Sequence, residues 1–297
     1  MDPDMLAACA DPKSIEGLTW LTCYLTSGKH LDFYWSFGTV LLLLAITAPT
    51  AMALGFGGAM AARSRIAPLR WIGKAYTAMV RGIPDIVYFM FFVIALDQGI
   101  EYIKSRFVCE NTGESVFQGL EFHVCAAAKV PLATASPFTF QAYGFALAVI
   151  TFAIIFGAFV ANVLFGAMQA VPRAQLETAE AYGMSHAQVF RRILVPQMWV
   201  YALPGLTNLW MILIKATPLL FLLGVKDIVY YARELGGTKT QAYDFPHSDW
   251  RLYYFIGLLI FYLLMTKLSE LVLSRLATRL SKGQATAAGE SIRRAGA

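Results

Sequence analysis

The chain has 297 residues, of which 58% are apolar and only 14% carry a charge, and its mean hydropathy is +0.56. Soluble domains usually contain about 25% charged residues, so the composition excludes an ordinary soluble enzyme or binding domain. The apolar residues come in long runs, and about 20 such residues cross the ~30 Å hydrocarbon core of a bilayer. The sequence therefore predicts an all-α, polytopic membrane protein.

The chain begins with a segment that lacks the pattern of a removable signal peptide. Residues 1–35 carry acidic side chains, and no basic start precedes an apolar run. We predict an external segment over 1–35, a transmembrane domain over 36–280, and a flexible tail over 281–297, which is polar and rich in small residues. The five predicted spans are 36–60, 75–97, 141–168, 199–224 and 252–273.

The distribution of Lys and Arg predicts the orientation of these spans. If loops 61–74 and 169–198 and the C-terminal tail share one side, that side, counted with the residues at the adjoining span ends, holds fourteen of the 24 basic residues and only four acidic ones. The other side holds nine basic and fourteen acidic residues. The C-terminus should therefore be cytoplasmic and the N-terminus outside. The pI near 9.0 then reflects membrane topology and does not indicate nucleic-acid binding.

The second and third spans are joined by a long predicted external loop, residues 98–140. All four cysteines lie in segments predicted to be outside, where an oxidising compartment allows disulfides with three possible pairings. Because Cys109 and Cys125 share this loop, we favour their pairing, and free thiols in a mobile loop are the alternative. The four histidines are isolated in the sequence, so no metal site is predicted.

A polar break, residues 170–197, separates the third span from the fourth. Read as a helix, its first part places Leu176, Ala179, Ala181 and Tyr182 on one side. Gly183 permits a sharp turn, and a second helix follows. That helix has Ser185 as its predicted N-cap, Val189, Phe190 and Ile193 as its apolar face, and Pro196 as its end.

Two short helices joined at a glycine form a compact knob, and an apolar stripe on it would fit a groove on a cytoplasmic partner. An interfacial helix lying on the lipid headgroups is the alternative. The sequence contains neither a G-x-x-x-x-G-K-[ST] phosphate loop nor a G-x-S-x-G turn. We therefore predict no catalytic residue, and uphill transport would need energy from a partner or an ion gradient.

The polar break resembles the EAA loop of ABC-importer permeases, whose form is EAA-x3-G-x9-I-x-LP. The matching residues are Glu177, Ala179, Gly183, Ile193 and Pro196, with Thr178 in place of Ala and Val195 in place of Leu. The segments "FGTVLLLL", "YTAMVRGIPDIVYFMFF" and "ALPGLTNLWMILIKATPLLFLLG" are similar to segments of the polar amino-acid permeases. The "RGIPD" and "FRRILVPQMWVYALPG" forms resemble the branch for histidine, arginine, related basic amino acids and opines.

This resemblance implies the fold of a type I ABC importer permease in a bacterial inner membrane. The implied partners are a periplasmic solute-binding protein, a second permease subunit and two copies of an ATPase, which would bind the ATP and magnesium. The polar break would be the coupling loop, seated in a cleft of the ATPase. Its coupling residues would be Glu177, Ala179, Ala181, Gly183, Phe190, Ile193 and Pro196.

Four polar residues within the predicted spans are candidates for the solute path: Asp85, Asn162, Asn208 and Lys215. A charge at the bilayer centre costs about 2.5–3.5 kcal/mol, so such groups should face the path or pair with one another. A structural pair of Asp85 with Arg81, or of Lys215 with a carbonyl, is the alternative. Asn162 stands where related permeases often carry Glu, which suggests that a paralogous partner permease supplies the main ionic contacts.

Two other classes of function stay open at this point. A gradient-driven transporter would show inverted repeats with broken helices at matching positions, and five spans do not divide into equal halves. A membrane assembly subunit that transports nothing would explain the interaction loop without a solute path. Association with an ATPase, and ATP hydrolysis stimulated by solute, would separate these classes.

Overall fold

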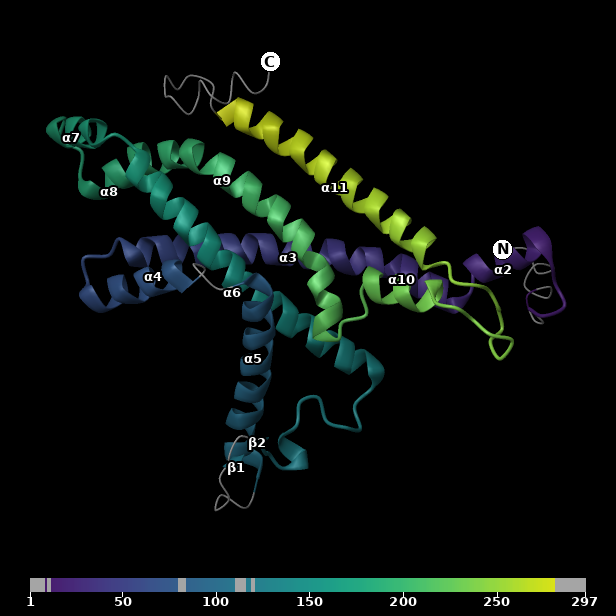
Figure 1. The fold of residues 1–297 in the computed structure, drawn as a ribbon. Helices are drawn as coiled ribbons and strands as arrows, with labels where there is room; N and C mark the ends of the chain where they lie inside the picture. Colours follow the sequence, from purple (N-terminus) through teal and green to yellow (C-terminus); the bar gives the residue numbers. More distant parts are fainter. Residues whose placement is uncertain (1–8, 10–11, 80–83, 110–115, 119–120, 281–297) are drawn as a thin grey trace. The chain divides into compact units, whose positions relative to one another are not determined.

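The computed structural model describes residues 9, 12–79, 84–109, 116–118 and 121–280 (Figure 1). Within them, five helices are long and apolar enough to cross a membrane. These helices are Gly28–Ala62, Ile86–Val108, Pro137–Ala170, His186–Phe221 and Arg251–Leu280. The prediction of an all-α polytopic protein is confirmed, and the only strands in the described part form one two-residue pair.

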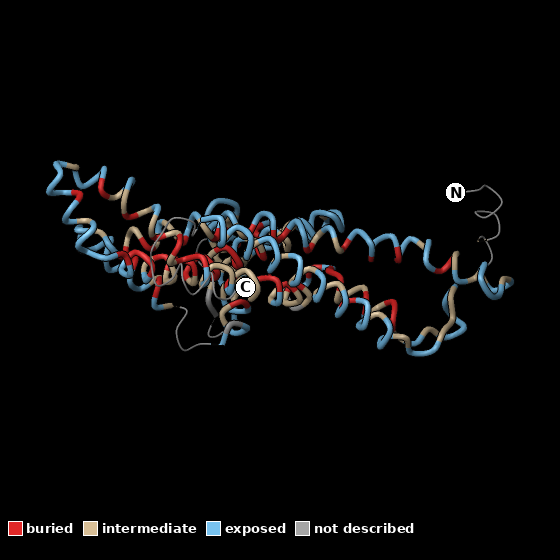
Figure 2. The backbone as a smooth tube through the Cα atoms, turned by 90° about the horizontal axis from the view of Figure 1, so that it is seen from above, coloured by how far each residue is buried: buried red, intermediate tan, exposed pale blue. Residues whose placement is uncertain are grey.

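The elements follow one another in the order shown in Figure 1. They are α2 (Gly17–Leu25), α3 (Gly28–Ala62), α4 (Ala67–Met79), α5 (Asp85–Val108), β1 (Phe117–Gln118), β2 (Glu121–Phe122), η1 (Ala126–Ala128), α6 (Pro137–Ala170), α7 (Arg173–Ala181), α8 (His186–Val189), η2 (Phe190–Leu194), α9 (Val195–Ala216), η3 (Thr217–Leu223), α10 (Ile228–Gly236) and α11 (Arg251–Leu280). Figure 2 shows exposed residues along the long helices, as expected for spans whose outer faces contact lipid.

The chain divides into two compact units, one made of residues 1–44 and 217–264 and the other of residues 45–216 and 265–297. We call the first the terminal unit and the second the central unit.

Close helix packing in the central unit depends on small residues. A Cβ added to Gly55 of α3 would lie 2.3 Å from a methyl carbon of Val160 in α6, and one added to Gly157 would lie 2.5 Å from the Tyr76 hydroxyl. Within a bilayer, small residues of this kind let helix backbones approach closely. Glycine at these positions therefore sets the spacing of α3, α4 and α6.

Helices α6 and α9 form the main core of the central unit. The buried apolar residues of this core are Ala59, Val160, Leu164, Ala167, Met168, Val171, Leu194, Met198, Ala202 and Leu209. The two helices lie close together where Gly205 of α9 packs against Val163 of α6, since a Cβ on this glycine would be 2.8 Å from a Val163 methyl. The core thus joins both sides of the polar break, residues 170–197.

The second span differs from the prediction of 75–97. Helix α4 doubles back on α3 and packs so closely that a Cβ added to Gly73 would lie 2.1 Å from the Ala62 nitrogen. The Tyr76 hydroxyl of α4 also donates to the Ile154 carbonyl of α6 at 2.7 Å. A new helix, α5, then begins after Pro84, a residue that cannot continue a preceding helix. The span is Ile86–Val108, so the first part of the loop expected over 98–140 is helical.

The segment between α5 and α6 is held by polar contacts and a disulfide. Glu101 of α5 is only 4% exposed and forms an ion pair with Lys129 at 2.9 Å. The Tyr143 hydroxyl of α6 donates to Asp97 of α5 at 2.8 Å. These contacts fix the end of α5 that is remote from α4.

The terminal unit joins α2 to segments more than 200 residues later in the chain. The Tyr24 hydroxyl lies 3.1 Å from His247 Nε2 and donates to the Leu235 carbonyl at 3.3 Å. His30 lies 2.6 Å from the Tyr254 hydroxyl, and Lys29 forms an ion pair with Glu234 at 2.7 Å. Aromatic rings reinforce these bonds, since Trp20, Tyr24, Phe245 and Trp250 contact one another with centroids 5.2–6.0 Å apart.

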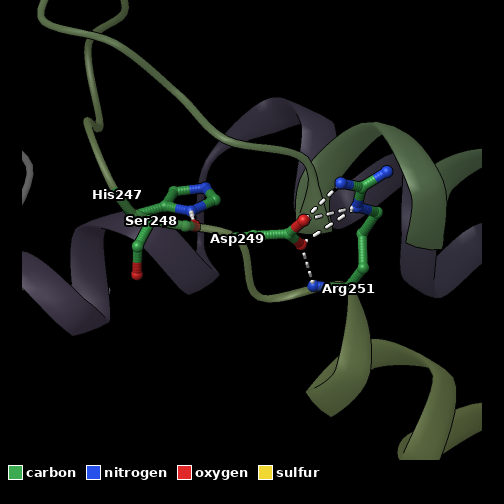
Figure 3. A network of polar contacts seen from close by, with 4 residues as sticks. All are labelled: His247, Ser248, Asp249 and Arg251. Carbon is green, nitrogen blue, oxygen red and sulfur yellow. Dashed lines mark hydrogen bonds and ion pairs between the residues drawn. The ribbon is translucent and has the colours of Figure 1, made fainter.

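Helix α11 begins at an ion pair of the terminal unit (Figure 3). The Asp249 carboxylate accepts a hydrogen bond from the Arg251 backbone at 3.0 Å and from its guanidinium Nε at 2.9 Å. Because of these hydrogen bonds from Arg251, the pKa of Asp249 falls to about 2. The carboxylate satisfies an N–H group at the helix start that has no partner within the helix.

Candidate functional site

The polar break forms two short helices, α7 and α8, which connect α6 to α9 within the central unit (Figure 1). Below, "the loop" means residues 170–197. Its predicted coupling residues are thereby brought together on one compact element. Glu177, Ala179 and Ala181 lie on α7, Gly183 lies in the turn, and the rest follow from η2 onward.

The turn between the two helices requires a glycine at position 183. Gly183 has a φ of +80°, in the left-handed region that side chains with a Cβ rarely adopt. Its N–H donates to the Glu180 carbonyl at 2.9 Å, and the N–H of Met184 donates to the Ala179 carbonyl at 3.1 Å. This is the Schellman arrangement, in which glycine ends a helix and satisfies its last carbonyls. The sharp turn predicted at Gly183 is present.

The second helix begins as predicted at Ser185. The Ser185 side chain accepts from the Gln188 N–H at 3.4 Å, and the Gln188 side chain accepts from the Ser185 N–H at 2.8 Å, which completes a capping box. In addition, His186 Nδ1 lies 2.8 Å from the Glu180 carboxylate and links α8 to α7. We did not predict this link, although the six-residue separation of Glu180 and His186 across a glycine turn is a usable signal.

The apolar side chains of the loop pack inward, against the protein itself. Ala179, Val189 and Leu194 are buried, and Leu176 and Phe190 pack against the α6–α9 core. These side chains therefore attach the loop to the bundle and are not available to a partner's groove, contrary to our interpretation of the stripe. Ile193 is half-buried.

The outer face of the loop carries different residues from those predicted. Ala181 and Tyr182 were expected to share the apolar side of α7 but are exposed, and Tyr182 is 86% exposed. Ala181 is the last residue of α7 and lies about 200° around the helix from the buried Ala179, so it faces away from the core. Tyr182 follows the last helical residue. Glu177 is exposed as well. The surface offered to a partner is thus a polar tip with one large aromatic side chain.

Pro196 does not end the second helix, and this prediction was wrong. The helix continues from His186 to Phe221 without a break. Residues Phe190–Leu194 form a π-helix, in which the Val195 N–H donates to the Phe190 carbonyl five residues earlier. A π turn is wider than an α turn and often marks a functional site. It leaves room for the proline ring, which in an α-helix would clash with the carbonyl four residues earlier.

The candidate path residues lie on helices α5, α6 and α9. Asn162 of α6 is half-buried, whereas Asn208 and Lys215 of α9 are exposed and lie seven residues apart, on one face of that helix. Asn162 precedes Val163, which contacts Gly205, three residues before Asn208. The two amides are therefore at a similar level of the α6–α9 pair.

The alternative that Lys215 and Asp85 form structural pairs can be examined for Lys215 but not for Asp85. Among the described residues, Lys215 makes no hydrogen bond or ion pair with a side chain or carbonyl that would neutralise it. Asp85 is the first residue of α5, and its proposed partner Arg81 lies outside the described residues. An exposed lysine in a membrane span is costly to place in lipid, so the face of α9 that carries Lys215 needs cover from a partner or from water.

Two disulfides are present. Cys109 pairs with Cys125 at a Cα–Cα distance of 6.1 Å, and Cys9 pairs with Cys23 at 5.5 Å. Both distances are in the usual range for disulfides. The first pair closes the end of α5 onto η1, far in the fold from the loop that joins α6 to α9 (Figure 1).

The sequence alone did not single out the buried acid Asp227, because this residue lies outside the predicted spans. Asp227 is fully buried, and its Oδ1 atom caps α10 by accepting from the N–H groups of Val229 and Tyr230 at 3.1 and 2.9 Å. Its Oδ2 atom has no hydrogen-bond partner within the described structure. Burial raises the pKa of Asp227 to about 6, and backbone hydrogen bonds, first among them the one from Tyr230, oppose this rise.

Comparison with protein families gives one match over most of the chain. The model of the family described as "Binding-protein-dependent transport system inner membrane component" matches residues 53–282. This range includes the loop and all four candidate path residues. It excludes the N-terminal segment that contains Cys9 and Cys23.

Several characterised proteins are similar over most of their length. The histidine/lysine/arginine/ornithine transport system permease protein HisQ of Salmonella typhimurium is 31% identical over 82% of this chain and 90% of its own. The arginine ABC transporter permease protein ArtQ of Escherichia coli is 29% identical over 82% and 91%. The octopine transport system permease protein OccQ of Rhizobium radiobacter is 28% identical over 78% and 83%.

A solved structure shares the fold. The crystal structure of an amino acid ABC transporter with histidines matches 86% of this chain and 98% of its own, with a TM-score of 0.59 and 20% sequence identity. At this level of identity the likeness concerns the arrangement of the helices.

Proposed function

Since this chain belongs to the family of binding-protein-dependent transport system inner membrane components, we propose that it lines the solute path of an importer for basic amino acids or opines. In this proposal, ATP hydrolysis by a partner drives the path between inward-open and outward-open states. The family gives the role of a permease, and the solute and the coupling mechanism are the proposed steps.

The proposed solute class is supported by the relatives. Three of them are permeases for arginine, for histidine, lysine, arginine and ornithine, and for octopine. Two of the four candidate path residues of this chain are neutral amides, and an amide such as Asn162 can accept a hydrogen bond from a cationic solute, although without the strength that a charged acceptor provides. We therefore assign the main ionic contacts to a paralogous second permease subunit.

One observation supports the coupling mechanism above all others, namely the unbroken helix from His186 to Phe221. It begins in the loop, passes through the π-helix and includes Asn208 and Lys215. Because the loop is docked on the α6–α9 core by buried apolar side chains, a force applied to its exposed tip reaches this helix directly. Closure of an ATPase dimer against the tip would thus tilt the helix that lines the path.

The partners follow from this mechanism. Two copies of an ATPase would hold ATP and magnesium and receive the tips of two permease subunits. A periplasmic binding protein would deliver the solute to the opposite side, where the N-terminus lies in the proposed orientation. The C-terminus would be cytoplasmic. Tight capture of solute belongs to the binding protein, because a path must release what it carries.

The test is reconstitution of the chain with its ATPase, second permease and binding protein in liposomes. Tyr182→Ala should weaken ATPase association by on the order of tenfold or more, as expected for an exposed aromatic anchor, and Glu177→Lys should abolish uptake of labelled arginine. Phe138→Ala is the matched control, because Phe138 is 78% exposed at the opposite end of α6. Normal ATPase association and normal uptake in both loop variants would refute the coupling assignment.

The solute class has a separate readout. The binding protein loaded with arginine, histidine or octopine should stimulate ATP hydrolysis, whereas glutamate should not. Stimulation by an acidic or apolar solute alone would leave the coupling mechanism intact and refute the proposed class.

A further inference from the structure

Helix α4 presents a surface that the transport mechanism does not use. We define the α4 surface as the basic residues Arg63, Arg65, Arg70 and Lys74 together with Trp71 and Ile72. All six are exposed, and Trp71 and Ile72 are 78% and 65% exposed. An exposed tryptophan beside an exposed isoleucine is unusual on a surface that faces only water.

The orientation of α4 is fixed by its opposite side. Gly73 lies against the backbone of Ala62, Thr77 is buried, and the Tyr76 hydroxyl donates to α6. Residues Trp71 and Lys74 therefore point away from the bundle. The α4 surface is held rigidly in place and is not the exposed side of a loosely attached helix.

The charges of the α4 surface have no partners within the protein. The sequence from Arg63 to Pro84 contains no Asp or Glu. In the described part of the chain, none of the four basic residues forms an ion pair. Arg70 and Lys74 lie one turn apart on α4, so their charges project from the same side of the helix. The surface thus has an unneutralised net charge of about +4 beside an apolar flank.

The α4 surface also lies at a definite place along the first span. Helix α3 ends at Ala62, and Arg63 and Arg65 occupy the tight turn that leads into α4. Because α4 then runs back along α3, its first turns lie at the level where the span leaves the bilayer. In the proposed orientation, that level is the cytoplasmic boundary.

We propose that the α4 surface binds the headgroups of acidic phospholipids in the inner leaflet. Tryptophan is enriched where hydrocarbon meets headgroup, because its ring is apolar and its N–H needs a polar partner. Guanidinium and ammonium groups form strong charge-assisted hydrogen bonds to phosphate. Ile72 provides apolar contact with the acyl chains, and the basic groups reach the phosphates of the same lipids.

The residues favour lipid over a protein partner at this surface. A docking site for the ATPase is expected at the loop, whose tip is polar and mixed in charge, with Glu177, Glu180 and His186 exposed. The α4 surface has one sign of charge and an apolar flank formed by Trp71 and Ile72. Acidic phospholipid is the environment that complements both properties at once.

The experiment measures contact between Trp71 and lipid in the full complex. The complex is placed in nanodiscs of phosphatidylethanolamine that contain brominated phosphatidylglycerol or, at equal mole fraction, brominated phosphatidylcholine. The fluorescence of Trp71 is taken as the difference between the native chain and Trp71→Phe. Brominated phosphatidylglycerol should quench this difference more strongly, and removal of each charge in Arg70→Gln and Lys74→Gln should lower the preference about fivefold.

Two variants control for charge and folding. Arg275→Gln with Arg279→Gln removes equal charge from the exposed end of α11 and should leave the preference unchanged. Arg70→Lys with Lys74→Arg keeps both charges and should keep the preference. Equal quenching by the two brominated lipids would overturn the proposal in favour of a non-selective contact, and no quenching by either would show that protein covers the surface. The readout needs no solute, so it is independent of the transport assay.

Discussion

The loop between α6 and α9 and the segment between α5 and α6 both connect spans, but they are held in different ways. The loop is attached by buried apolar side chains such as Val189 and Leu194 and by backbone caps at its turn. The other segment is attached by the Cys109–Cys125 disulfide and the ion pair of Glu101 with Lys129. One relies on packing and backbone geometry, and the other on covalent and ionic links.

This difference agrees with the proposed orientation of the protein. Disulfides persist in the periplasm and are reduced in the cytoplasm, so only the outer segments can use them. Apolar packing and a glycine turn do not depend on redox state or on pH. They suit a loop that must transmit force under cytoplasmic conditions. The comparison thus predicts that the two regions respond to different perturbations.

The largest effect should come from the glycine turn of the loop. Gly183→Val forces a β-branched residue into a left-handed backbone conformation, which costs on the order of 1–3 kcal/mol and disrupts the Schellman turn. We expect solute-stimulated ATP hydrolysis to be lost while the protein still reaches the membrane. ATP hydrolysis by the reconstituted complex and the amount of protein in the membrane fraction are the measurements.

Gly166→Val is the matched control for this substitution. An added Cβ would meet nothing within 4 Å at either Gly166 or Gly183, but only Gly183 has a positive φ. Gly166→Val should therefore keep nearly full coupled hydrolysis. Equal loss in both variants would show that side-chain bulk matters and backbone conformation does not.

The second effect concerns only the segment between α5 and α6. Replacing both Cys109 and Cys125 by alanine removes a cross-link between residues 16 apart in sequence, which is worth about 3 kcal/mol for a loop of this size. Hydrogen exchange should accelerate at η1 and at the end of α5 but not at α7. Dithiothreitol should reproduce this pattern in the native protein.

Labelling with a membrane-impermeant maleimide tests whether Cys109 and Cys125 are paired. Both cysteines should react only after reduction. Immediate labelling without a reductant would establish free thiols. The segment between α5 and α6 would then not be held by a disulfide, contrary to the comparison.

The sequence predicted the loop better than it predicted the arrangement around it. Gly183 and Ser185 act through local backbone conformation and through hydrogen bonds a few residues away, and both were identified correctly from the pattern. Three of the five predicted spans lie within their helices, and a fourth, 199–224, extends only three residues past Phe221, because long apolar runs are a strong signal.

The errors have a common physical cause, which is that tertiary packing overrides local pattern. The second span was misplaced because α4 folds back on α3 through Gly73, a contact that no local signal reveals. Pro196 was predicted to end a helix because proline usually does so. The π-helix that precedes it cannot be predicted from residue types. Likewise, the bond between Tyr24 and His247 joins residues 223 positions apart.

The smallest effect is a pH dependence that belongs to the terminal unit and to neither of the two connecting segments. Asp227 of the terminal unit has a pKa raised to about 6 by burial, against an ordinary value of 3.8. In the folded state its proton is retained to higher pH than in the unfolded state. The free energy of unfolding therefore falls as pH rises between about 4 and 6, and the contribution present at low pH is lost above the folded pKa.

Hydrogen exchange at α10, corrected for its intrinsic pH dependence, measures this effect. Amides of α10 should be better protected at pH 5 than at pH 7, by on the order of 1–2 kcal/mol, because this interval covers only part of the range between the unfolded and folded pKa values. Asp227→Asn stays neutral and keeps an oxygen that can accept from Val229 and Tyr230, so the pH dependence should vanish. Exchange at α4 should show no such change, because α4 contains no Asp, Glu or His. If α10 and α4 respond alike, or if Asp227→Asn keeps the dependence, the assignment to this carboxyl is wrong.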